Sequence, residues 1–273
     1  NIKRLIGSAL AAADFSGCPL FDNAAVACLA ACRRLTRLDC SNTAVTALAP
    51  LAASNLVTLI ADDLRLHALC RIAVGTLSLV NTTVCGSPIR STDAIHHAVR
   101  HLDIGDSDVE AVGGGLVSLG LSNCPLVTDE TVGGLSEGLL QLDLAHCSVV
   151  CPALPASLTV LSVNGTDVGQ AFFEAIAPLP NLRVLSAKDT NVGAAGMAAL
   201  AGADLLFLAV GPDQSIDDNA IAHLPRRLGD GHHGRGPPLR RGDGPVPLLR
   251  LRLRLYDGWQ PRAARERLVG VCN

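Results

Sequence analysis

Aromatic side chains and charges are scarce in this chain of 273 residues. Phe, Trp and Tyr make up 3% of the sequence and charged residues 17%, whereas hydrophobic residues make up 49%. The core must therefore be built from Leu, Val, Ala and Ile, and such uniform side chains suit repeating layers better than one irregular core. The chain also has only one Trp and one Tyr, two residue types that commonly dominate binding hot spots.

Long apolar runs are missing as well. No stretch approaches the roughly 18–20 apolar residues that span a bilayer, and the apolar part of the opening segment is too short for a convincing secretory signal. The 10 Cys residues are too sparse for a disulfide scaffold. Because several Cys also follow a repeat described below, we expect buried, reduced thiols and a cytoplasmic location.

The charge of the chain is divided unevenly. Up to Pro225 there are 11 Lys and Arg against 21 Asp and Glu, and from Arg226 onward 11 Arg against 4 Asp and Glu. A break of this kind indicates a boundary or an appended segment. We expect an N-terminal cap or partial repeat over 1–9, a repeat domain over 10–228 and a Gly/Pro/Arg-rich tail over 229–273.

The tail leaves three interpretations open. Residues Leu248–Leu255 read LLRLRLRL, an alternation of apolar and basic residues that is typical of a strand. This segment could cover the last strand of the repeat domain as a cap. The tail could equally be a disordered basic arm, or sequence that is out of frame.

One stretch shows the repeat most clearly. Leu139–Val149 reads LLQLDLAHCSV, which matches the spacing L-x-x-L-x-L-x-x-N/C-x-L. The fourth position of this pattern recurs along the chain at intervals of 17 to 25 residues, at Ala13, Leu38, Leu59, Leu77, Leu102, Leu119, Leu142, Leu161, Leu185 and Leu208.

Two further positions of the repeat are apolar. Side chains two residues apart on a strand point to the same side, so the fourth and sixth positions should form two columns of a core. We expect a third column at the eleventh position, formed by Leu20, Val45, Leu66, Val84, Val109, Leu126, Val149, Val168 and Val192. In the tenth repeat the eleventh position is the polar Ser215, and the apolar Ile216 follows one residue later.

The ninth position carries small hydrogen-bonding residues. It is occupied by Cys18, Thr43, Leu64, Thr82, Ser107, Cys124, Cys147, Thr166, Thr190 and Asp213. A hydroxyl or thiol there can satisfy buried backbone groups of the turn and bridge to the neighbouring repeat. Leu64 lacks such a donor, and an ionised Asp213 can only accept a hydrogen bond.

These repeats resemble the leucine-rich repeat family over roughly residues 8–222. The segments Cys18-Pro-Leu, Cys124-Pro-Leu and Cys147 look like its cysteine-containing subclass, with Thr or Cys at the usual Asn position. The resemblance implies an α/β solenoid of about ten repeats, curved, with parallel strands on its concave face and short helices, 3₁₀ segments or turns on its convex face.

The segments that return between strands differ in length. The longer ones predict helices at Asp22–Cys32, Asp129–Leu135 and Phe172–Ile176, the first with Asp22 as its cap. The shorter ones have room only for a turn or a short 3₁₀ segment, as the return Cys151–Leu158 with its two Pro residues indicates.

The resemblance places the binding face on the exposed strand positions three, five and seven. That face is small, polar and somewhat acidic, so we expect a non-catalytic module whose protein partner offers a basic segment. The alternative is that Asp is simply a frequent solvent-facing residue there. The predicted partner-binding residues are Arg37, Asp39, Asp62, His101, Asp103, Gln141, Asp143 and Lys188.

The sequence leaves two other functions to consider. Cysteine-containing repeats of this kind follow an F-box in ubiquitin ligases, so the chain could be a substrate-recognition subunit that lacks its F-box here. An enzyme finds little support, because Gly134-Leu-Ser136-Glu-Gly138 matches a nucleophile elbow only in letters and lies before a strand rather than after one. Nucleic acid, a membrane and a small-molecule substrate are not expected as partners.

No metal or cofactor is expected either. His96, His97 and His101 cluster in sequence, but His101 falls on a strand and His97 in the preceding return segment, whereas a zinc site needs converging ligands. Cys28 and Cys32 lie four apart on an expected helix, where core packing is the better explanation of two thiols.

Overall fold

The computed structural model describes residues 9–69, 71–92, 95, 98–113 and 115–210. The chain divides into two compact units, Asn1–Gly231 and His232–Asn273, and every described residue belongs to the first. The three interpretations of the tail, the proposed N-terminal cap apart from its last residue, and the irregular turn with Asp213 and Ser215 therefore lie outside the described residues.

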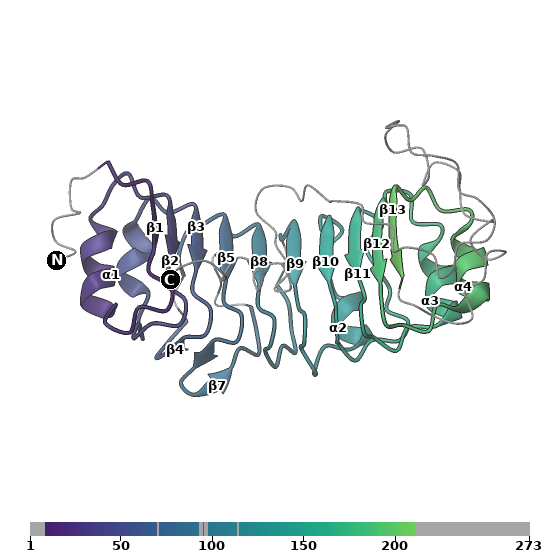
Figure 1. The fold of residues 1–273 in the computed structure, drawn as a ribbon, viewed down its shortest axis with the longest axis horizontal. Helices are drawn as coiled ribbons and strands as arrows, with labels where there is room; N and C mark the ends of the chain where they lie inside the picture. Colours follow the sequence, from purple (N-terminus) through teal and green to yellow (C-terminus); the bar gives the residue numbers. More distant parts are fainter. Residues whose placement is uncertain (1–8, 70, 93–94, 96–97, 114, 211–273) are drawn as a thin grey trace, which may run out of the picture. The chain divides into compact units, whose positions relative to one another are not determined.

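Ten short strands form one parallel sheet in the first unit (Figure 1). Successive strands are neighbours in the sheet, except that the small strands β4 (Arg65–Leu66), β6 (Thr83–Val84) and β7 (Ser87–Pro88) belong to a second sheet. The ten strands are β1 (Ala12–Asp14), β2 (Arg37–Asp39), β3 (Thr58–Ile60), β5 (Thr76–Ser78), β8 (His101–Asp103), β9 (Ser118–Gly120), β10 (Gln141–Asp143), β11 (Val160–Ser162), β12 (Val184–Ala187) and β13 (Phe207–Val210).

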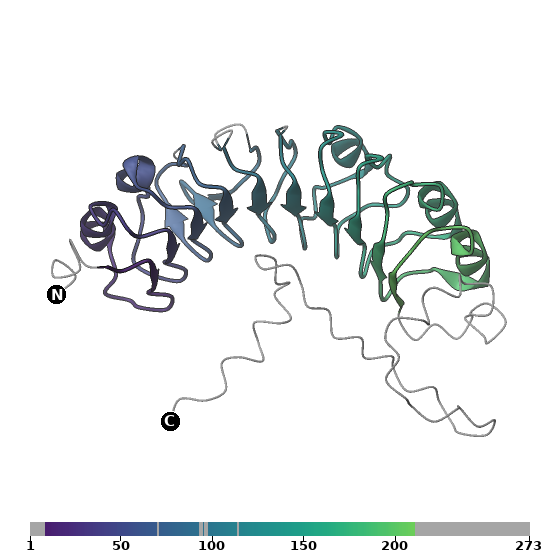
Figure 2. The same cartoon turned by 90° about the horizontal axis from the view of Figure 1, so that it is seen from above.

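The register of this sheet follows the predicted repeat. Ala13 pairs with Leu38, Leu38 with Leu59, and so on through all ten fourth positions to Leu208. The fold class is confirmed: the described chain is an α/β leucine-rich repeat solenoid. Within this unit the strands line the inner side of the row of repeats, and the helices lie on the outer side (Figure 2).

The fourth and sixth positions form the core, as predicted. From β2 to β12 the side chains at both positions are buried in every repeat. At the two ends of the sheet Ala13, Phe15, Leu208 and Val210 are only partly buried, because the described residues form a neighbouring repeat on only one side of each.

The return segments carry the helices. The predicted ones are present as α1 (Asn23–Ala30), α2 (Asp129–Gly133) and α3 (Gln170–Ile176). Asp22 caps α1 as expected, since its carboxylate accepts a hydrogen bond of 2.9 Å from the Ala25 amide. The return Cys151–Leu158 contains no helix, also as predicted. Two short helical segments were not predicted, α4 (Gly193–Leu200) and the 3₁₀ helix η2 (Ala49–Ala53).

The prediction for the eleventh position is wrong in the two Cys-Pro-Leu repeats. Leu20 is 92% exposed and Leu126 is 41% exposed, whereas the next residues, Phe21 and Val127, are 3% and 0% exposed. In each repeat the Cys carbonyl accepts a hydrogen bond from the amide three residues later, at 3.0 Å for Phe21 and 3.2 Å for Val127. Pro favours the second position of such a turn, and the turn directs Leu outward and the following residue inward.

A second, three-stranded sheet was not predicted. It consists of β4 (Arg65–Leu66), β6 (Thr83–Val84) and β7 (Ser87–Pro88). The strands β6 and β7 are antiparallel and are joined by Cys85 and Gly86, which both have positive φ. Two such residues are typical of a tight type I′ hairpin turn.

The eighth position of the repeat has left-handed backbone in all nine described turns. Its occupants are Gly17, Asn42, Asp63, Asn81, Asp106, Asn123, His146, Gly165 and Asp189. Gly enters this region freely, and Asn and Asp do so at lower cost than other residues. This position lies in the turn that follows each strand, two or three residues after the strand ends.

A substitution at the eighth position tests this requirement. Asn123 has φ of 56° and an exposed side chain. Asn123→Val should lower the free energy of unfolding by about 1–2 kcal/mol, because a β-branched residue is disfavoured there. Asn123→Gly should change it by less than about 0.5 kcal/mol. Urea denaturation measures both, and equal losses in the two variants would contradict the requirement.

Candidate functional site on the strand face

The eight predicted partner-binding residues lie on one face but differ in exposure. Arg37, His101 and Lys188 are exposed, and Asp39, Asp103 and Gln141 are partly buried. Asp62 and Asp143 are buried. The face runs from β2 to β12, but two of its predicted contact residues are buried and expose little surface to a partner.

Aspartates at the fifth position bind the start of the turn that follows their own strand. The Asp14 carboxylate accepts hydrogen bonds from the amide and hydroxyl of Ser16, at 2.9 and 2.7 Å. Asp39 does the same with Ser41, at 3.0 and 2.7 Å. One oxygen of each carboxylate is therefore engaged by the repeat itself.

The fifth-position aspartates in β8 and β10 repeat this contact with the backbone. Asp103 accepts a hydrogen bond from the Gly105 amide at 3.3 Å, and Asp143 accepts one from the Ala145 amide at 3.1 Å. A Cβ atom at Gly120 would lie 2.7 Å from Oδ1 of Asp103. The glycine thus makes room for the Asp103 side chain to reach over the next strand.

Two residues at the seventh position bridge successive repeats in the same manner. Asp62 Oδ1 accepts hydrogen bonds from the Ser78 hydroxyl at 2.6 Å and the Val80 amide at 3.0 Å. Asn164 Oδ1 accepts hydrogen bonds from the Ser186 hydroxyl and the Lys188 amide, both at 2.8 Å. This role was not predicted from the sequence, although a polar residue at position seven followed one repeat later by Ser at position five could have indicated it.

The ninth-position column joins repeats only in part. Thr82, Cys124 and Cys147 donate to the sixth-position carbonyl of the preceding repeat, at 2.8, 3.5 and 2.9 Å. This confirms the predicted bridge for these three residues.

Three other ninth-position residues bond within their own repeat. Thr43, Thr166 and Thr190 donate to the sixth-position carbonyl of that repeat, at 2.7, 2.6 and 2.8 Å. The Ser107 hydroxyl is buried and has no hydrogen-bond partner among the described residues.

The buried thiols are poorly suited to chemistry. Burial is the main cause that raises the pKa of Cys40 to about 12, of Cys124 to about 11 and of Cys147 to about 12. A thiol with such a pKa is protonated near neutral pH, whereas the nucleophile and metal ligand is the thiolate. Cys147 therefore has a structural role between repeats, as its place in the ninth-position column predicted.

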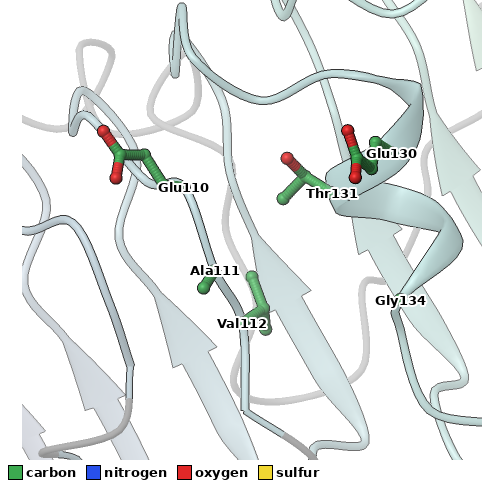
Figure 3. A pocket seen from close by; sticks show the side chains of 6 residues that line it. All are labelled: Glu110, Ala111, Val112, Glu130, Thr131 and Gly134. Carbon is green, nitrogen blue, oxygen red and sulfur yellow. The ribbon is translucent and has the colours of Figure 1, made fainter.

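A second candidate is a hollow of about 410 Å³ on the helical side (Figure 3). Glu110, Ala111 and Val112 line one wall, and Glu130, Thr131 and Gly134 of the α2 region line the other. It lies beside the return segment between β8 and β9, which contains no helix in its described residues. Glu110 already forms an exposed ion pair with Arg90 at 3.2 Å, so the hollow is a weaker candidate than the strand face.

The remaining sequence candidates do not form a site in the described chain. His96 and His97 lie outside the described residues, and no group of three or more His, Cys, Asp or Glu placed to hold a metal ion occurs among the described ones. Ser136 lies between α2 and β10, in the helix-before-strand order that argued against a nucleophile elbow. The Cys32 thiol donates to the Cys28 carbonyl at 3.9 Å. None of the described helices is long and apolar enough to cross a membrane.

Comparisons with known proteins show that the chain is similar to other proteins in structure but not in sequence. No family model and no curated protein matches the sequence. Among solved structures, an internalin (inlF) from Listeria monocytogenes aligns with 70% of this chain and 71% of its own, at 13% identity and a TM-score of 0.40. A second internalin from the same organism, inlC2, aligns with 77% of this chain and 84% of its own, at 18% identity and a TM-score of 0.41.

The buried carboxylate of Asp143 predicts a pH effect. Burial raises its pKa, against the lowering by hydrogen bonds from Ala145 and Ser162 and by the nearby His146. A raised pKa in the folded state means that ionisation costs stability at neutral pH and that the cost vanishes as the pH falls below the unfolded pKa. Asp143→Asn should therefore match or exceed the wild type in stability at pH 7, and its advantage should shrink on acidification.

Thermal melting of both proteins between pH 7 and pH 3 measures this difference. Asn keeps an oxygen for the Ala145 amide, so the variant removes the charge and keeps that contact. An advantage of the variant that grows as the pH falls would show that the ionised carboxylate stabilises the fold.

Proposed function

We propose that the chain is a non-catalytic module that binds a protein partner on the strand face. The observation that supports this is the continuous sheet itself, which places exposed Arg37, His101 and Lys188 in three different repeats of one face. A partner that contacts all three must be large, because adjacent strands lie about 4.8 Å apart and many strands separate them. A protein surface or an extended segment meets that requirement.

The chemistry of the face also supports binding over catalysis. Its carboxylates accept hydrogen bonds from backbone amides or Ser hydroxyls. The three thiols whose pKa is strongly raised are buried and stay protonated near neutral pH. Catalysis needs a nucleophile or base that is activated and accessible. The cytoplasmic location remains a prediction.

Affinity capture with the full chain tests the proposal. In one variant Arg37, His101 and Lys188 are all changed to Glu. In the control variant Arg34, Arg65 and His67, which are exposed and lie off the ten strands, are changed to Glu. Both variants carry the same change in charge.

A protein that the wild type and the control retain, and that the face variant loses by about tenfold or more, is the expected result. Equal loss in both variants, or retention by the face variant, would place binding elsewhere.

A second candidate is substrate recognition in a ubiquitin ligase. It rests on the likeness to the cysteine-containing subclass, and the two Cys-Pro-Leu segments do form matching turns that start at Cys18 and Cys124. The protein sequence upstream of Asn1 tests it directly. An F-box there would support this role, and any other kind of domain in its place would contradict it.

A further inference from the structure

We infer that the partner docks at the β11–β13 end of the strand face, through a segment that carries apolar side chains and a carboxylate. This inference rests on the proposed function and names the part of the face and the chemistry of the partner. It differs from the expectation of a basic segment that the acidic sequence of the face suggested.

An apolar strip crosses these three strands. Val160 pairs with Val184, and Val184 pairs with Phe207, at the third position of each strand. Paired residues on neighbouring strands stand side by side, and all three side chains are only partly buried. Leu206, directly before Phe207, is 58% exposed and extends the apolar surface at the edge where the strands begin.

The same row is polar near the other end of the sheet. Its third positions in β2, β3, β5 and β8 are Arg37, Thr58, Thr76 and His101. The strip is therefore a local feature and not a property of every repeat. It is also distinct from the core, because the core columns point to the other side of the sheet. A contiguous apolar surface with polar surroundings is typical of a protein-binding site.

Lys188 supplies the charge beside this strip. It directly follows β12 and is exposed, and it forms no ion pair among the described residues. Lys188 lies four residues after Val184, about 13 Å along an extended chain, and Ser186 lies between them. Among the described third, fifth and seventh positions from β10 to β13, the other charged residue is Asp143, which is buried and bonded to Ala145.

The acidic half of the face offers less to a partner. Asp39 and Asp62 each use an oxygen on the repeats themselves, at distances of 3.0 Å or less. At the β11–β13 end, in contrast, the exposed charged residue among the described third, fifth and seventh positions is the cation Lys188. Asp189, which follows it, is also exposed but lies at the eighth position, in the turn. A partner that places apolar side chains on the strip and a carboxylate near Lys188 is complementary in both respects.

Two synthetic peptides of equal length probe this chemistry. Both contain Phe-Leu-Phe followed by Ser-Ser, and one then continues with Glu residues and the other with Lys residues. Binding to the full chain is measured by fluorescence anisotropy. The Glu peptide should bind the wild type more tightly than the Lys peptide.

Substitutions locate the binding. Val184→Lys and Lys188→Glu should each weaken the Glu peptide by about tenfold, and Lys188→Glu should also reverse the preference between the peptides. Arg65→Glu on β4 is the control with the same charge change, and it should leave the affinity within about twofold. Melting curves confirm that each variant is folded.

Several outcomes would overturn the inference. These are tighter binding of the Lys peptide by the wild type, no binding of either peptide, or an equal effect of Arg65→Glu and Lys188→Glu. A protein captured by the wild type and lost on Arg37→Glu or His101→Glu, but retained by Val184→Lys and Lys188→Glu, would also overturn it. That last result would still support the proposed function, because a protein would bind elsewhere on the strand face.

Discussion

The alignment of ten short strands in one register is the constraint on which the rest of the structure depends. Each strand contributes only three or four residues, so no single strand pairing is strong, and every return segment must bring the chain back to the same place. The apolar columns at positions four and six make the register favourable, because a shift by one residue would turn these side chains out of the core. The left-handed residue at position eight starts each return.

This constraint also determines what the strand face can offer to a partner. Side chains that point away from the core still serve the sheet, because each turn contains backbone amides that need acceptors. Asp14, Asp39 and Asp143 meet that need within a repeat, and Asp62 and Asn164 meet it between repeats. The groups that remain for a partner are therefore fewer than the sequence suggests.

Much of the fold could be predicted from the sequence, because it follows from periodic spacing. The ten fourth positions, the two core columns and the helices α1, α2 and α3 are where the pattern placed them. The outward turn of Leu20 and Leu126 was missed, because the pattern counts residues and does not represent the turn that Pro introduces. The hairpin at Cys85 and Gly86 was missed because it lies in a return segment that has no period.

The site was harder to predict than the fold. The alternation of a strand correctly placed Arg37, His101 and Lys188 on the exposed face, but it treated Asp62 and Asp143 as equally exposed. Their burial arises from neighbours in adjacent repeats, which one repeat read alone does not show. Apart from His146, the position-eight residues were visible in the sequence as a column of Asn, Asp and Gly, and a search for left-handed turns would have found that column.

A comparison of two hydroxyls tests most directly whether polar side chains hold successive repeats together. The Thr82 hydroxyl donates to the Ala61 carbonyl at 2.8 Å and accepts from the Leu64 amide at 3.2 Å, whereas the buried Ser107 hydroxyl has no partner among the described residues. Thr82→Val should lower the free energy of unfolding by about 1–3 kcal/mol, because it leaves buried backbone groups unpaired. Ser107→Ala should change it by less than about 0.5 kcal/mol, since no hydrogen bond is lost. Equal losses in urea denaturation of the two variants would contradict the account.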